Sequence, residues 1–210
     1  MTSEDIATAL EKDLLRGAFP PGSTLPQGAL ATRFGVSRIP VRDALAQLAR
    51  AGLVDVTPNR RARVVQMSRA DVVEAYDLRL LLECDLLARA IPVMTQDDLH
   101  HIDYALARSN LEARNANWSE GDALFHSALY APARRPRHLS IIETLRCVCR
   151  LQIAAYDTLP ANTDLWLADH AHLRDLCHHG DATKAVACLR SHLEGAREVL
   201  LDTLSTKKTG

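Results

Sequence analysis

The stretch from Pro26 to Val54, PQGALATRFGVSRIPVRDALAQLARAGLV, restricts the possible folds of this chain more than any other. Two apolar stripes at helical spacing are separated by Gly35, which predicts two short helices joined by a tight turn. Ser37 stands where the second helix needs an N-cap, and Pro40 falls in its first turn, where a missing N–H costs little. The stretch therefore predicts a helix-turn-helix.

Arg38 and Arg42 are four residues apart near the start of the second helix, on the face opposite its apolar stripe. In helix-turn-helix proteins this recognition helix enters the major groove with its N-terminal end first. A planar guanidinium suits that task because it can pair with guanine edges or clamp phosphates. The pattern predicts DNA binding; by itself it also fits an ordinary surface pair of arginines.

A small hairpin follows, since Leu53–Val56 and Ala62–Met67 read as two strands around the tip TPNRR. Between Pro26 and Gln66 seven arginines stand against two acidic residues, although the whole chain has a formal charge of −1. Such a concentration of positive charge is typical of a phosphate-binding surface, because neutralised phosphates release counterions. The predicted DNA-binding residues are Arg33, Ser37, Arg38, Arg42, Asn59, Arg60 and Arg61.

Three segments, PGSTL (Pro21–Leu25), LATRFGVSRIPVRDAL (Leu30–Leu45) and LARAGLV (Leu48–Val54), resemble the winged-helix DNA-binding domain of GntR-family bacterial transcription regulators. The resemblance implies that the hairpin is a wing lying along the DNA backbone and minor groove. Arg61 stands where family members usually carry glycine in the tip, so the tip must turn through Asn59.

A second departure lies before the first helix of the motif, where the family tends to carry an acidic-basic pair. Gln27 and Gly28 replace that pair, which removes one contact that the resemblance implies.

From Ser68 onward the chain reads as helical, and a helix over Ile6–Gly17 precedes the helix-turn-helix. The six helices predicted in the second region are Asp71–Ile91, Thr95 to about Arg114, Trp118–Ala131, Leu139–Thr158, Asp164–His179 and Asp181–Leu204. The predicted fold class is mainly α. A winged helix-turn-helix domain of three helices and a two-stranded wing spans 1–67, an all-α helical-bundle effector domain spans 68–204, and 205–210 form a flexible tail.

Four polar residues of the second region can converge inside such a bundle. Asp122 and His126 are four apart, so both leave one face of their helix. His170 lies ten residues before Gly180 and His192 twelve after it, which places them at similar height in a helical hairpin. One carboxylate and three imidazoles suit a divalent Zn, Ni, Mn or Fe ion. The chain has nine histidines, however, and any one of them is more often a surface or core residue.

The segments DALFH, DHAHLRDLCHHGD and SHL resemble the FCD effector domain of the FadR-like branch of GntR regulators. The resemblance implies that Asp122, His126, His170 and His192 hold the metal ion, with His172 as a substitute for His170 if its helix rolls. In members that lost the metal, these positions form a hydrogen-bonded polar cluster.

The resemblance also implies a place for the effector. Arg79 matches an arginine that often points into the ligand cavity of the family, although it could equally pair with Glu83 on its own helix. Arg146 and Arg150, four apart on a largely apolar helix, are the other candidates for binding the effector.

These features predict a ligand-responsive transcription regulator, a repressor that binds a palindromic DNA operator as a homodimer. A small carboxylate metabolite is the expected effector. Five cysteines without a CxxC pair predict reduced thiols, and the absence of a membrane span or signal peptide predicts a cytoplasmic protein. A metal-dependent hydrolase with a DNA-anchoring domain and an architectural DNA-binding protein with a structural metal remain as alternatives.

Overall fold

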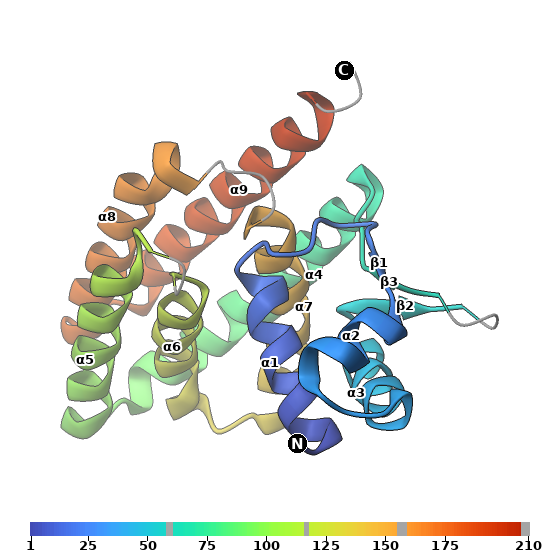
Figure 1. Cartoon of the computed structure of the whole chain (residues 1–210). Coiled ribbons are helices and arrows are strands. Elements are labelled where there is room, and N and C mark those ends of the chain that lie inside the picture. Colours follow the sequence, from blue (N-terminus) through green and yellow to red (C-terminus); the bar gives the residue numbers. More distant parts are fainter. Residues whose placement is uncertain (58–60, 116–117, 155–158, 207–210) are drawn as a thin grey trace. The chain divides into compact units, whose positions relative to one another are not determined.

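The computed structural model describes residues 1–57, 61–115, 118–154 and 159–206 (Figure 1). Its contacts group the chain into two compact units. The first contains Met1–Met67 and, from much later in the chain, Cys147–Tyr156; the second contains Ser68–Arg146 and Asp157–Gly210. The domain limits expected from the sequence stay a prediction, because the contacts assign the later segment to the first unit.

Three helices of the described residues lie wholly in the first unit: α1 (Ser3–Leu15), α2 (Gln27–Phe34) and α3 (Arg38–Arg50). Helix α1 starts in a capping box, in which Thr2 accepts from the Asp5 backbone N–H and the Asp5 carboxylate accepts from that of Thr2. Helix α2 ends at Gly35, whose φ of 65° lies in the left-handed region that only glycine adopts freely. The predicted helix-turn-helix is therefore confirmed in its order and its turn.

The sheet of this unit has three strands, β1 (Thr24–Leu25), β2 (Val54–Val56) and β3 (Ala62–Val64), in the antiparallel order β1-β3-β2. The expected wing of two strands is thus extended by β1, in a segment where the sequence predicted no strand. Two residues are too few to show the alternation of a strand, so only pairing with β3 reveals it. The expected turn at Asn59 lies outside the described residues.

The core of the first unit joins α1 to the helix-turn-helix. Ile6, Leu10 and Leu14 are fully buried, as are Val41 and Ala44 of α3. The same cluster contains Cys147 and Leu151, which lie on the later segment of the chain. Gln152 of that segment accepts from the Met67 N–H and donates to the Val65 C=O. The later segment is therefore an integral part of the packing of the first unit.

The second unit is helical throughout its described residues, as expected. Its helices are α4 (Arg69–Ala90), α5 (Gln96–Glu112), α6 (Trp118–Tyr130), α7 (Pro136–Ala154), α8 (Leu159–His178) and α9 (Ala182–Thr206), with short 3-10 turns at Ile91–Val93 and Ala131–Ala133. Capping boxes at Ser68 and Thr95 start α4 and α5. Helix α7 is shared, because residues 136–146 group with this unit and residues 147–154 with the first.

Two helices of the second unit begin three or more residues earlier than the sequence predicts. Helix α7 starts at Pro136 rather than Leu139, and α8 starts at Leu159 rather than Asp164. Each has a proline in its first turn, where the missing N–H has no intrahelical partner to lose. Periodicity alone treats these prolines as breaks, whereas here they open the helices.

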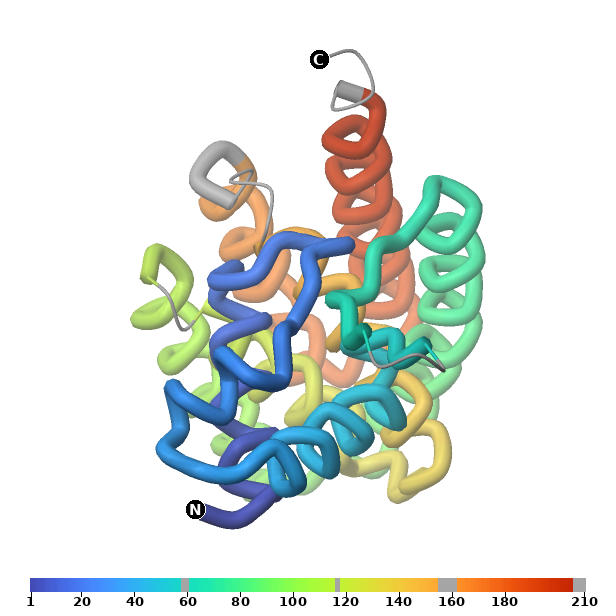
Figure 2. The backbone as a smooth tube through the Cα atoms, turned by 45° about the vertical axis from the view of Figure 1, so that its right-hand side comes forward, coloured from blue at the N-terminus to red at the C-terminus, as the bar shows by residue number. Residues whose placement is uncertain are grey.

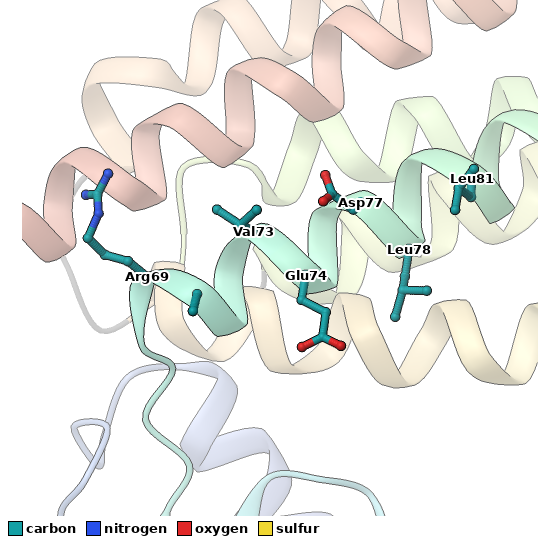
Figure 3. A pocket seen from close by; sticks show the side chains of 7 residues that line it. Arg69, Val73, Glu74, Asp77, Leu78 and Leu81 are labelled. Atoms are coloured by element: carbon teal, nitrogen blue, oxygen red, sulfur yellow. The ribbon is translucent and has the colours of Figure 1, made fainter.

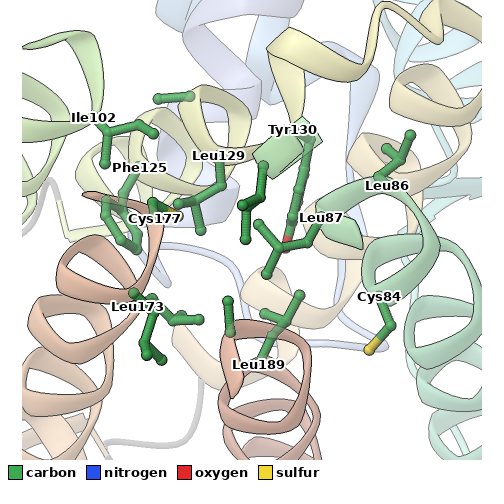
Figure 4. Close-up of a cluster of buried hydrophobic side chains, with 14 of the residues drawn as sticks. Cys84, Leu86, Leu87, Ile102, Phe125, Leu129, Tyr130, Leu173, Cys177 and Leu189 are labelled. Carbon is green, nitrogen blue, oxygen red and sulfur yellow. The ribbon is translucent and has the colours of Figure 1, made fainter. Parts of the chain in front are cut away.

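Helices α4 and α9 lie side by side along the bundle, as both views of the backbone show (Figure 2). The core between the helices contains Phe125, Leu129 and Tyr130 of α6, packed with Leu173 of α8 and Leu189 of α9 (Figure 4). No helix among the described residues is both long and apolar enough to span a membrane.

Candidate functional site

The recognition helix α3 presents its expected DNA-binding side chains to solvent. Ser37 occupies the N-cap position with an extended backbone, but its side chain makes no capping hydrogen bond. Arg38 and Arg42 are both exposed, and Arg42 has Asp43 close by, with Nε 3.5 Å from Oδ1. A Cβ added at Gly28 would stand 3.6 Å from Nη2 of Arg38, an ordinary van der Waals contact, so the Arg38 guanidinium lies beside α2.

Two other arginines of the predicted DNA-binding set differ in their surroundings. Arg33 pairs with Asp13 at 2.6 Å and lies over the Phe34 ring, so its positive charge is partly neutralised within the unit. Arg61 is exposed at the end of the hairpin, where its C=O accepts from the Thr57 N–H. Asn59 and Arg60 lie outside the described residues.

The second unit brings together three buried histidines from three helices. His126 comes from α6, His170 from α8 and His192 from α9, with exposed fractions of 1%, 3% and 8%. Their ligand atoms all lie within 4.8 Å of one another. Nε2 of His126 and Nε2 of His170 are 3.2 Å apart. Two nitrogens bound to one ion at ~2.1 Å lie about 3.0 to 3.4 Å apart, so this spacing fits shared coordination.

Asp122 lies beside this triad, one helical turn before His126. Its Oδ1 is 3.6 Å from Nε2 of His126 and 3.9 Å from Nε2 of His170. The two distances exceed the upper end of the spacing expected between two ligands by about 0.2 Å and about 0.5 Å. His172, the alternative ligand on α8, is exposed to solvent. The four residues predicted to bind metal thus converge, and His172 is not among them.

His126 and His170 are held in the neutral form that a metal requires. Burial lowers the pKa of His126 well below its usual value, and nearby Arg146 lowers it further. Burial and the neighbouring His192 lower the pKa of His170 to about 3. Nδ1 of His126 lies 3.1 Å from the Tyr130 hydroxyl, and Nδ1 of His192 lies 3.0 Å from Asp169. Such contacts fix ring orientation and leave Nε2 for a ligand bond.

A buried ionic network adjoins the histidines. The fully buried Glu83 carboxylate accepts from Arg79 at 2.7 Å, from Arg146 at 3.0 Å and from the Tyr130 hydroxyl at 2.7 Å. Burial raises the pKa of Glu83, but the two guanidiniums outweigh it and the pKa is lowered overall. Arg146 also donates to Oδ2 of Asp122 at 2.6 Å. The network therefore connects Glu83, through Arg146, to an expected metal ligand.

Sequence patterns identify only part of this network. They indicate Glu83 as a helical partner of Arg79, which is correct, but they miss the contacts that Glu83 makes with Tyr130 and Arg146. The available signal was a carboxylate within the apolar run LRLLLECDLL, where a charge is retained only if it is paired. Arg150 is buried, but in the stretch of α7 that groups with the first unit.

One pocket of this unit lies on the exposed face of α4 (Figure 3). Val73, Leu78 and Leu81 project from the helix there, with Leu81 70% exposed. Glu74 and Asp77 are the acidic residues along it, with no histidine or cysteine among its described lining to complete a ligand set. This pocket therefore offers no complete set of metal ligands, in contrast to the buried histidine cluster.

A winged helix-turn-helix is a DNA-binding architecture, and in this chain an all-helical bundle follows it. Residues 2–64 match the family described as bacterial regulatory proteins, gntR family, and residues 74–195 match the FCD domain. The protein belongs to the FadR-like GntR/FCD family. It is a transcription regulator, and the alternative of a hydrolase is set aside.

Named relatives agree with this assignment. The chain is 26% identical over 204 residues to the HTH-type transcriptional repressor RspR of Escherichia coli, covering 93% of this chain and 87% of the relative. It is 28% identical over 214 residues to the repressor NanR of Cronobacter sakazakii, covering 91% and 82%.

Solved structures share the fold. Escherichia coli McbR/YncC has a TM-score of 0.81 at 22% identity, covering 94% of this chain and 96% of that one. A GntR regulator from Rhodococcus sp. RHA1 has a TM-score of 0.83 at 23% identity, covering 95% and 97%.

Proposed function

We propose that the protein is a repressor that binds a palindromic operator as a homodimer. Binding of a small carboxylate either lowers or raises its affinity for that operator. Relatives RspR and NanR are named repressors. One recognition helix reads only a half-site, so a symmetric dimer is needed for useful specificity. Because the operator is chromosomal DNA, we place the protein in the cytoplasm.

The proposed sensor is one divalent ion held by Asp122, His126, His170 and His192. The observation that carries this proposal is the buried set of three imidazoles beside a carboxylate oxygen, at spacings suited to shared coordination. Nitrogen and oxygen ligands suit Zn, Ni, Mn or Fe. The ion, when bound, would supply a Lewis-acid position for an anionic oxygen.

The buried arginines are suited to bind the part of such an anion that does not contact the metal ion. Nε of Arg146 is buried without a hydrogen-bond partner, so this guanidinium keeps an unused donor beside the cluster. The close acidic partners of Arg79 and Arg146 are Glu83 and Asp122. With a divalent ion present, the centre would hold excess positive charge, which favours a carboxylate over a neutral ligand.

Helix α7 offers a physical route from the sensor to the DNA-binding unit. Arg146, which holds Asp122, is the last residue of α7 that groups with the second unit. Cys147, the next residue, already packs in the core of the first. A ligand that shifts Arg146 therefore acts on a helix that continues into that core.

The test is His126→Ala, with exposed His172→Ala as the matched control on the same unit. His126→Ala should lose the copurified metal, measured by mass spectrometry, and the metal-linked rise in thermal stability. That rise is about 2.7 kcal/mol when free metal exceeds its Kd by about 100-fold. Operator affinity without ligand should stay unchanged, while the response to added small mono- and dicarboxylates should vanish. Stoichiometric metal in His126→Ala would overturn the proposed site.

A further inference from the structure

The recognition helix carries an apolar side chain that the fold does not use. Ile39 is 63% exposed. Among the described residues of the first unit, only Met1 and Val56 are comparable large apolar side chains exposed to solvent. Ile39 packs in neither hydrophobic core. Isoleucine is also a mediocre helix former, so neither folding nor helix propensity explains it at this exposed position.

The position of Ile39 places it with the residues that face DNA. It is the second residue of α3, directly after Arg38. Arg42 and Asp43 follow it by three and four residues and are exposed, so they share its face of the helix. The opposite face, with Val41, is buried. Ile39 is therefore on the leading turn of the helix that enters the major groove.

The chemistry of the major groove limits what such a side chain can contact. Base edges there present hydrogen-bond donors and acceptors, and the C5-methyl of thymine is the apolar group among them. Covering a donor or acceptor with an isoleucine would desolvate it without a replacement hydrogen bond. The β-branched side chain is also restricted to few rotamers in a helix, so binding removes little of its freedom.

We propose that Ile39 is a specificity-determining residue that packs against the methyl group of a thymine in each half-site of the operator. Arg38 and Arg42 on either side supply polar contacts, and Ile39 distinguishes thymine from cytosine at one position. Only the burial of apolar surface stabilises this contact, so it requires the methyl group and not the hydrogen-bonding groups of the base.

The test removes that methyl group. An operator is first selected from random duplex DNA with the wild-type full-length protein. Each thymine is then replaced by deoxyuridine, which lacks only the methyl, and affinity is measured by fluorescence anisotropy at constant salt. For the wild type, replacing the thymine at one symmetric position of the two half-sites should lower the affinity for the operator about four-fold for each methyl group removed. Ile39→Ala should bind the thymine and deoxyuridine operators equally.

Two variants sharpen the comparison. Ile39→Val keeps part of the contact and should retain a reduced dependence on the same methyl. Ile141→Ala removes an isoleucine that is 51% exposed on α7 and should behave as the wild type. A wild type indifferent to every deoxyuridine substitution would overturn the proposal. So would a methyl dependence that persists in Ile39→Ala. Tight binding of the wild type to the thymine operator separates both outcomes from a failure of operator binding itself.

Discussion

Glu83 is a buried carboxylate whose contacts involve three helices. It lies on α4 and accepts hydrogen bonds from Tyr130 of α6 and Arg146 of α7, as well as from Arg79 on its own helix. A buried ion pair adds little net stability, but removing one partner leaves an uncompensated charge and typically costs about 3–5 kcal/mol. The main effect of these contacts is therefore to orient the Arg146 guanidinium toward Asp122.

At the same scale, Arg42→Ala should weaken operator binding by about 1–3 kcal/mol, because it removes one bidentate pairing with a base edge. The fold should be unaffected, since Arg42 is exposed and lies opposite the buried stripe of α3. Arg50→Ala at the other end of the same helix is the matched control and should have a smaller effect. Anisotropy titrations at one salt concentration measure both. Equal affinity of Arg42→Ala and the wild type would mean that another face of α3 reads the operator.

At the scale of elements, the close packing of α5 and α6 depends on one residue without a side chain. A Cβ added at Gly121 would stand 2.9 Å from the Cα of Ser109 and 3.2 Å from Oε2 of Glu112. The first of these atoms is backbone and can move only if the helices separate. Glycine at this position is therefore required by tertiary packing and not by a turn.

Gly121→Ala should consequently destabilise the protein by about 1–3 kcal/mol, seen as a lower midpoint in chemical denaturation. Gly195→Ala is the control, because a Cβ there meets nothing within 4 Å. In the interior of α9 that substitution should stabilise by about 0.5–1 kcal/mol through helix propensity. If both variants shift stability in the same direction, the α5–α6 contact is looser than described.

At the scale of the whole molecule, the charge is unevenly distributed along the chain. The formal net charge is −1, yet the arginines of the helix-turn-helix and wing make that region strongly positive. Counterion release then makes operator affinity fall steeply with salt. The remainder of the chain is net acidic and does not compete for polyanions.

Arg61→Ala tests this distribution. The slope of log affinity against log salt should become shallower by about 0.9 for each phosphate that is no longer neutralised. Specific and non-specific DNA should be affected alike, because phosphates carry no sequence. Arg89→Ala removes the same charge from an exposed pair with Asp85 on α4 and should leave the slope unchanged. A weakening confined to one operator sequence would instead indicate base reading from the wing.

Much of this architecture could be predicted because its causes are local. Gly35 in the left-handed region, the capping box at Thr95 and the turn at Gly180 each depend on a few neighbouring residues. Helical periodicity placed Asp122 and His126 on one face, and the hairpin about Gly180 brought His170 and His192 to similar height. The order of the helices, and the shared face or height within each of these two pairs, follow from such local rules.

Only the tertiary structure decided the rest, since it depends on partners distant in sequence. Strand β1 exists because Thr24 and Leu25 pair with β3, and a pattern of two residues cannot predict that pairing. The contacts of Glu83 with Tyr130 and Arg146 span 47 and 63 positions. The division of α7 between the two units likewise depends on the hydrophobic core in which each of its turns packs. By itself the sequence determined the elements and the chemistry that they carry; burial and long-range packing determined which groups face one another.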